Sequence, residues 1–329
     1  MAMTDASRRI ASARWSRRAA PLIARLAMVL FATCTQAQTL PGAQRVEFDS
    51  GGSLKVFAHA FTPPPAPAGT RVPALVILHG SEGLSDAREG AWGRELAALG
   101  MVVFVVDSFT PRNVKTTVDD QTRVTTGQML ADAFGALEFL AQQSFVDPLR
   151  IAVMGMSKGG GAALLSSDRR AQAGGRAFAA HLTLYPLCLS QYRAPQSAAP
   201  ILMLLAENDD YTGVKPCADY AERIRKTGGR VDLKTYKGAP HGFDGDARNV
   251  GGHRLANAQN FLDCVMMIEE DGRTVLTKTG AVLDTPQRAL EALKRECMRT
   301  GATVASNPEA RQRALADVTT FLKTTILKP

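Results

Sequence analysis

A serine, a histidine and a group of acids stand in this chain in an order that suits acyl transfer. Ser157 lies between Gly155 and Gly159, after an apolar run and before a stretch of small residues. A strand, a sharp turn and a helix would hold such a serine in a strained conformation, with room only for glycines on either side. The pattern also arises by chance in glycine-rich chains, so Ser157 alone is only a candidate nucleophile.

The best partner for this serine is His241. A serine hydroxyl becomes nucleophilic when a histidine takes its proton and an acid orients that histidine, and after this type of turn the chain order is serine, acid, histidine. His59 and His79 precede the serine, and His181 lies in an apolar, strand-like run. His241 lies in a turn-rich loop after an alternating run, whereas His253 follows a polar glycine-rich stretch typical of a surface loop. We therefore predict that His241 is the general base, the alternative being a merely hydrogen-bonded loop histidine.

The orienting acid should end a strand between the serine and the histidine. Residues 200–206 form a continuous apolar run of the kind buried on both faces of a parallel sheet, and carboxylates follow it at Glu207, Asp209 and Asp210. Asp209 has the favoured position. Asp210, which would also suit a turn or helix cap, and Glu207 stay open as alternatives.

Backbone N–H groups for an oxyanion are expected at two places. One is Lys158, at the start of the helix after the serine, and the other is Ser81, in the turn that follows the apolar run 72–79. His79 in that turn is interpreted as structural. Glu82 either tunes the site electrostatically or is a solvated loop residue.

The loop from 107 to 123 carries cations at the same predicted edge of the sheet. Arg112, Lys115 and Arg123 could hold an acidic group of a substrate through charge-assisted hydrogen bonds. Solvated loop charges are the commoner explanation. We retain Arg112 and Arg123, with Glu82, as possible substrate-binding residues.

Alternating strands and helices would position these groups. After a predicted hairpin (44–48 and 54–61), strands are expected at 74–79, 101–106, 150–154, 178–184, 200–205 and 231–236, and helices at 90–99, 124–142, 158–167, 216–227 and 308–326. Such alternation predicts an α/β fold with a mostly parallel, doubly wound sheet. A single domain spans 38–329, because no long linker interrupts the pattern.

An insertion of about 263–301 precedes the terminal helix. It is expected to contain a hairpin that turns near Asp271 and a helix at 286–298, and it either covers the active-site mouth or is a surface excursion. Cys264 and Cys297 flank it, while Cys188 and Cys217 lie near adjacent strand ends. We favour these two disulfides among the three possible pairings, and no two cysteines have the spacing of a metal site.

The N-terminal 37 residues are expected to be a signal peptide. Six arginines lead into a short apolar run and a small-residue site, with cleavage predicted near Ala37. The apolar run is too short to span a bilayer, so stable membrane insertion is not expected. This segment also carries +5 of the formal net charge of +8, which leaves too little elsewhere for a nucleic-acid-binding stripe. A periplasmic or secreted protein is predicted, the alternative being a cytosolic enzyme with a basic leader.

Taken together, these motifs resemble the dienelactone hydrolase family of the α/β-hydrolase superfamily. The resemblance is carried by residues 79–83, 106–112, 153–160, 185–188, 207–212 with Cys217, and 236–244. It implies a triad of Ser157, Asp209 and His241. Dienelactone hydrolases proper use a cysteine nucleophile where this chain has serine, so the resemblance implies a general ester or lactone hydrolase.

The sequence thus predicts a serine hydrolase that cleaves a small carboxylic ester or lactone through an acyl-enzyme on Ser157. No metal or organic cofactor is needed for this chemistry. A peptidase or amidase of the same fold is one alternative, because a triad does not distinguish esters from amides. A binding protein that retained the fold without catalysis is the other.

Overall fold

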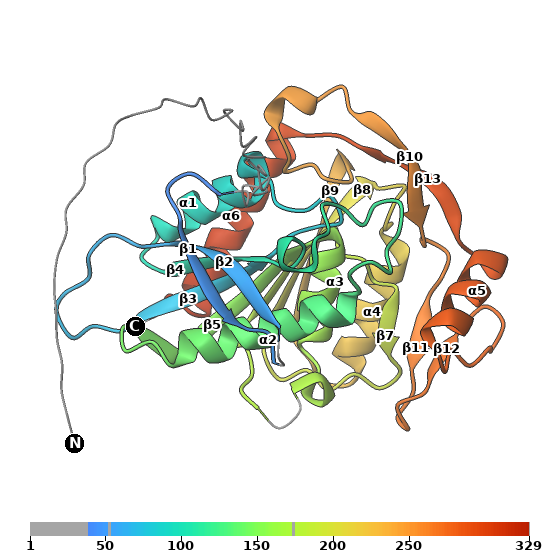
Figure 1. The fold of residues 1–329 in the computed structure, drawn as a ribbon, viewed down its shortest axis with the longest axis horizontal. Coiled ribbons are helices and arrows are strands. Elements are labelled where there is room, and N and C mark those ends of the chain that lie inside the picture. The colour runs from blue at the N-terminus through green and yellow to red at the C-terminus, as the bar shows by residue number, and fades with distance from the viewer. Residues whose placement is uncertain (1–38, 52–53, 173–174, 329) are drawn as a thin grey trace, which may run out of the picture. The chain divides into compact units, whose positions relative to one another are not determined.

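The computed structural model describes residues 39–51, 54–172 and 175–328. Their central element is an eight-stranded sheet with the strand order β1-β2-β4-β3-β5-β6-β8-β9 (Figure 1). The strands are β1 (Gln44–Asp49), β2 (Lys55–Phe61), β3 (Val72–Leu78), β4 (Val102–Asp107), β5 (Val146–Met156), β6 (His181–Leu184), β8 (Ile201–Asn208) and β9 (Val231–Pro240). The hairpin β1–β2 joins β4 in antiparallel fashion, and all pairs from β4 to β9 are parallel. The predicted α/β-hydrolase fold is therefore confirmed.

Helices cover both faces of the sheet. The helices are α1 (Ala91–Ala97), α2 (Thr126–Ala141), α3 (Ser157–Leu165), α4 (Lys215–Lys226) and α6 (Pro308–Thr324). One apolar core packs α1 and α6 against the sheet, and two others pack α2, α3 and α4 against its opposite face. The central strands are buried on both faces, which explains why their sequences are continuous apolar runs.

The segment before α6 is larger than the sequence predicted. The expected hairpin is present as β11 (Met266–Ile268) and β12 (Thr274–Leu276), and the expected helix is α5 (Pro286–Glu296). Three strands were not predicted: β7 (Ser190–Tyr192), β10 (His253–Asn260) and β13 (Arg299–Val304). The pair β10–β13 extends the insertion back to residue 253. These strands lack an alternating apolar pattern because much of their length is exposed.

Two disulfides link the cysteines as predicted, Cys188 to Cys217 and Cys264 to Cys297. Disulfides of this kind persist in oxidising compartments, which agrees with a periplasmic or extracellular setting. Within the described ranges, no helix is long and apolar enough to cross a membrane. The predicted signal peptide lies outside the described residues and stays a prediction.

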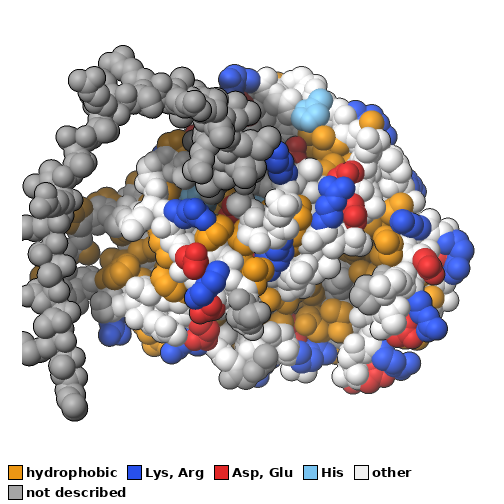
Figure 2. All heavy atoms as spheres, viewed as in Figure 1, with side chains coloured by type: hydrophobic (Ala, Val, Ile, Leu, Met, Phe, Trp, Pro, Cys, Tyr) orange, Lys and Arg blue, Asp and Glu red, His pale blue; other side chains and the backbone are white. Residues whose placement is uncertain are grey.

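Surface charges of both signs are interspersed. On the face shown in Figure 2, Lys and Arg side chains alternate with Asp and Glu side chains. Ion pairs among the described residues include Arg123 with Asp119 and Arg193 with Glu269.

Candidate active site

Ser157 lies at the turn between β5 and α3. Its backbone has φ = 50°, in the left-handed region that a non-glycine residue seldom adopts. A Cβ on Gly155 would lie 2.2 Å from the carbonyl oxygen of Gly159, and one on Gly159 would lie 2.4 Å from the carbonyl oxygen of His79. The two glycines are therefore required by close backbone packing, as the sequence pattern predicted.

The structure brings Ser157, His241 and Asp209 into one hydrogen-bonded chain. Nε2 of His241 lies 3.0 Å from Oγ of Ser157, and Nδ1 of the same ring lies 2.8 Å from Oδ2 of Asp209. All three residues are buried. Since an ionised Asp209 can only accept at Nδ1, that nitrogen carries the proton and Nε2 is free to accept from the serine hydroxyl.

The loop after β8 holds the Asp209 carboxylate from several sides. Its Oδ1 accepts the backbone N–H groups of Tyr211 (2.9 Å) and Thr212 (2.8 Å), and its Oδ2 accepts the Thr212 hydroxyl (2.7 Å). Burial alone would raise the pKa of Asp209. The attraction of His241 and the hydrogen bonds from His241 and Thr212 outweigh burial and keep this pKa below its ordinary value. Asp209 is thus held as the anion.

The alternative acids and the alternative histidine lie elsewhere. The carboxylate of Asp210 accepts from the backbone N–H (2.8 Å) and the hydroxyl (2.9 Å) of Thr303 on β13. Glu207 accepts from the backbone N–H of Gly238 on β9. His253 is exposed and lies beside Asn249.

Ser81 lies in the wall of the pocket that contains Ser157. The turn before it is held by His79, whose Nε2 accepts the N–H of Ser108 (3.3 Å), so that Nδ1–H donates to the carbonyl oxygen of Gly80 (2.8 Å). Burial lowers the pKa of His79, in keeping with this neutral form. A Cβ on Gly80 would lie 3.4 Å from Cβ of Ser157, so the turn approaches the serine closely.

The side chain of Lys158 is buried and contacts the 117–121 loop. Its Nζ donates to the carbonyl oxygen of Gln121 (2.9 Å) and the hydroxyl of Thr117 (3.3 Å). The backbone N–H of Thr117 in turn donates to the carbonyl oxygen of Ser81 (2.8 Å). Lys158, the residue after the serine, is therefore connected to the 117–121 loop and, through Thr117, to the turn at Ser81.

Because Lys158 is buried, we predict that the free energy of unfolding depends on pH. Burial lowers the pKa of its ammonium from 10.5 to about 7. Between these values the unfolded chain binds a proton that the folded chain does not, so the free energy of unfolding should rise with pH, by up to about 1 kcal/mol per pH unit. Lys158→Met should flatten this rise in urea titrations from about pH 7 to pH 10. Parallel curves for the two proteins would refute the assignment.

Neither arginine retained from the sequence lines the Ser157 pocket. Arg112 forms a forked ion pair with buried Asp132, with both N···O distances 2.8 Å. Arg123 pairs at the surface with Asp119. Nearby acids thus already pair with both guanidinium groups. The cation in the pocket wall is Arg88, which sequence reasoning missed.

Arg88 is itself compensated by acids. One guanidinium nitrogen lies 3.5 Å from Glu82, and Nε lies 3.6 Å from Asp244, which is fully buried. Asp244 also accepts from the indole of Trp92 (2.7 Å) and the hydroxyl of Tyr185 (2.5 Å). Glu82 lines the Ser157 pocket, and its partner there is Arg88.

Two further residues near the Ser157 pocket were not singled out from the sequence. The side-chain amide of Gln121 contacts the Ser81 hydroxyl (3.0 Å) and the Tyr211 hydroxyl (3.2 Å). The ring of Tyr211 packs against His241, with centroids 5.0 Å apart. Position alone could have suggested Tyr211, since it directly follows the acidic group, but Gln121 is identifiable only from the fold.

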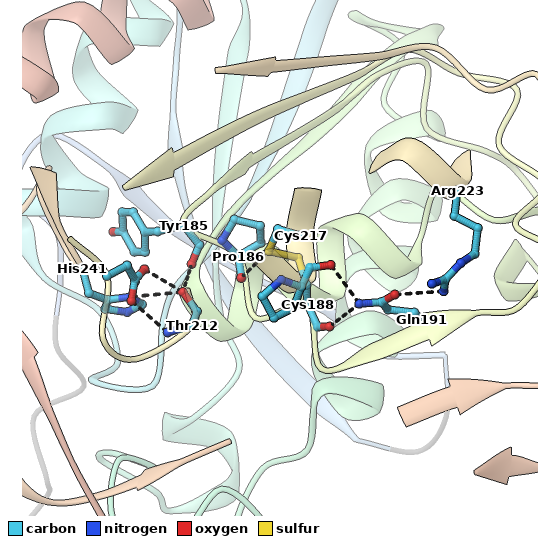
Figure 3. The surroundings of a disulfide bond; sticks show 10 residues. Tyr185, Pro186, Cys188, Gln191, Thr212, Cys217, Arg223 and His241 are labelled. Carbon is cyan, nitrogen blue, oxygen red and sulfur yellow. Dashed lines mark hydrogen bonds and ion pairs between the residues drawn. A yellow bond between two sulfur atoms is a disulfide. The ribbon is translucent and has the colours of Figure 1, made fainter. Parts of the chain in front are cut away.

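The Cys188–Cys217 disulfide lies next to the backbone of Pro186, which directly follows Tyr185 (Figure 3). It joins the segment after β6 to the first turn of α4. The Thr212 hydroxyl, which contacts Asp209, also lies 3.1 Å from the carbonyl oxygen of Tyr185. The disulfide closes a covalent loop that contains Thr212, and the Tyr185 carbonyl that Thr212 contacts lies three residues before Cys188.

We expect the double variant Cys188→Ser with Cys217→Ser to lose about 2–4 kcal/mol of unfolding free energy, because the unfolded chain is no longer restricted by this loop. Urea unfolding of the oxidised wild type and the variant measures the difference. Cys264→Ser with Cys297→Ser is the matched comparison for the other disulfide. An unchanged midpoint in the first double variant would contradict the prediction.

The pocket over Ser157 is narrow. Its volume is about 10 Å³, room for about one water molecule. Its lining includes Val118, Tyr211, Leu255 and Val304. A wider hollow of about 180 Å³ adjoins it and shares Glu82, Arg88, Gly242 and Val304 with it.

Comparison with known proteins shows the family to which the chain is related. Residues 58–270 match the sequence profile of the dienelactone hydrolase family. A putative carboxymethylenebutenolidase of Aquifex aeolicus is 25% identical over 222 residues, which are 62% of this chain and 88% of that protein. A probable 2-oxo-3-(5-oxofuran-2-ylidene)propanoate lactonase of Bradyrhizobium is 25% identical over 190 residues, 53% of this chain and 74% of that protein.

The fold is shared with an esterase of known structure. Esterase 2 of Thermogutta terrifontis superposes with a TM-score of 0.52 at 20% identity, covering 64% of this chain and 86% of the esterase. At this identity the likeness concerns the fold. The profile match spans well over half of the present sequence, from β2 to the hairpin β11–β12. The chain therefore belongs to the dienelactone hydrolase family and is a hydrolase of carboxylic esters or lactones.

Proposed function

We propose that the protein is a serine hydrolase that cleaves an ester or lactone through an acyl-enzyme on Ser157. The observation that carries this proposal is the continuous chain of contacts from Oγ of Ser157 through His241 to Asp209, at 3.0 and 2.8 Å. Each group is buried and has the protonation pattern that the reaction needs.

In the first half-reaction, Nε2 of His241 takes the hydroxyl proton as Oγ of Ser157 attacks the substrate carbonyl carbon. The carbonyl oxygen becomes an oxyanion, which the backbone N–H groups of Ser81 and Lys158 are proposed to stabilise. The N–H groups in the first turn of α3 have no acceptor within the helix, which supports this role for Lys158. The protonated His241 then gives its proton to the departing alkoxide.

In the second half-reaction, water replaces the alcohol. His241 takes a proton from the water as its oxygen attacks the acyl carbon, and the Ser157–acyl bond breaks with return of the proton to Oγ. Asp209 keeps Nδ1 protonated throughout and stabilises the imidazolium that forms twice in each cycle.

The charges around the pocket favour an uncharged ester or lactone. The cation in the wall, Arg88, lies between two carboxylates, Glu82 and Asp244. A substrate carboxylate would therefore meet a compensated guanidinium, with little net attraction. Preference for a carboxylate-bearing substrate is accordingly not expected.

A panel of purified-protein assays tests this function. Neutral short esters and lactones should be hydrolysed, and carboxylate-bearing esters of equal size should be no better. Aminoacyl amides form the third class, and faster cleavage of amides than of esters would favour a peptidase instead. Failure to hydrolyse any member of the panel would contradict the proposed function.

A further inference from the structure

The strand pair β10–β13 forms one wall of the Ser157 pocket. Leu255 on β10 and Val304 on β13 both line it. Leu255 packs with Val118 and Tyr211 in a small apolar cluster. Figure 1 shows this pair, in orange and red, next to the ends of β8 and β9. The whole of β13 lies outside the region matched by the family profile, which ends at residue 270.

Hydrogen bonds attach this wall to the loops that hold the acid and the histidine. Asp210, next to Asp209, accepts two hydrogen bonds from Thr303. On the other side, the backbone N–H of Ala305 donates to the carbonyl oxygen of His241 (3.1 Å). The wall is thus bonded to the residue beside the acid and to the histidine itself.

A third attachment reaches the 117–121 loop. The backbone N–H of Gln259 donates to the carbonyl oxygen of Val118 (2.8 Å), and the side chain of Gln259 accepts from the N–H of Gln121 (2.9 Å). Beyond this point the insertion has its own apolar core and the Cys264–Cys297 disulfide. These hydrogen bonds at three places, together with the apolar core and the disulfide of the insertion, fix the position of the wall.

The pocket that contains Ser157 is much smaller than the hollow that adjoins it. Beside Ser157 the volume is about 10 Å³, whereas the adjoining hollow has about 180 Å³. Gly242, directly after His241, lines that hollow. Ser157 and His241 line the narrow pocket and do not line the hollow. An acyl group bonded to Oγ of Ser157 therefore starts in the narrow pocket, where Leu255 and Val304 form part of the lining.

We propose that β10–β13 is a size-selecting wall that restricts the enzyme to esters of short acyl groups, of about two or three carbons. This inference rests on the proposed serine hydrolase function. A longer acyl chain would collide with Leu255 or Val304, and one methylene in a fitted pocket changes specificity by about tenfold or more.

The test uses a series of p-nitrophenyl esters from acetate to octanoate with the full-length protein. For the wild type, kcat/KM should fall at least about tenfold from acetate to hexanoate. Leu255→Ala and Val304→Ala each remove bulk from the wall and should raise the hexanoate-to-acetate ratio by about tenfold. Asn257→Ala, at an exposed position on the same strand that does not line the pocket, is the control and should leave the ratio unchanged.

The two substitutions lie on different strands, so either one carries the test if the other fails to fold, as judged by its thermal unfolding. A folded variant whose hexanoate-to-acetate ratio of kcat/KM equals that of the wild type would overturn the proposal that β10–β13 selects by size. A wild type that hydrolyses all chain lengths equally would overturn it as well. A wild type that cleaves no ester of the series overturns the size-selecting wall, and the serine hydrolase function fails with it only if lactones are not cleaved either.

Discussion

Replacing Ser157 with alanine should lower kcat for any substrate ester by about 10^4-fold or more, because no other group can form the acyl-enzyme. His241→Ala should have an effect of similar size, since Ser157 would have no base within reach. Steady-state assays, corrected with enzyme-free blanks, measure the kcat of both variants. Near-normal turnover by Ser157→Ala would end the assignment of the nucleophile.

The double variant sharpens this expectation. Ser157 and His241 act as one unit, so combining the two substitutions should cost little more than either alone. If the two losses multiplied instead, the residues would be acting independently, and the 3.0 Å contact between them would not be the catalytic one.

Asp209→Asn is expected to lower kcat by about 10^4-fold while the fold is kept. The amide of asparagine can donate to Nδ1 of His241, which would favour the tautomer with its proton on Nε2, where it cannot accept from the serine. The effect should appear in kcat more than in KM, because orientation of the base is needed in the transition state.

Asp210→Asn is the matched control for this substitution. It is the same chemical change one residue away, but Asp210 faces Thr303 and is separated from the histidine ring. A loss of less than about tenfold is expected. The reverse order of the two effects would move the orienting acid to Asp210.

The sequence predicted the central part of the site because its signals are local. The turn at Ser157 needs small neighbours, and Gly155 and Gly159 are found where a Cβ would strike backbone. The chain order after this turn then selected His241 and favoured Asp209, and in the structure His241 contacts both Ser157 and Asp209. Continuous apolar runs likewise predicted the parallel strands, since these are buried on both faces.

Contacts between segments that are distant in the chain could not be predicted from such local sequence patterns. Arg112 suggested a substrate contact by its place in a loop, but its partner Asp132 lies 20 positions further along, on α2. The wall residues Leu255 and Val304 come from exposed strands with weak periodicity, and they meet only because β10 pairs with β13. Such pairings depend on tertiary structure, which overrides local propensity.

The most direct test of the account is covalent labelling with a fluorophosphonate probe followed by peptide mapping. Such a probe phosphonylates a serine that is activated by a neighbouring base, independently of the natural substrate. We predict one label per protein, on Ser157, lost in Ser157→Ala and strongly slowed in His241→Ala. A folded wild-type protein that takes up no label, or takes it up at another residue, would contradict the proposal that Ser157 is the nucleophile.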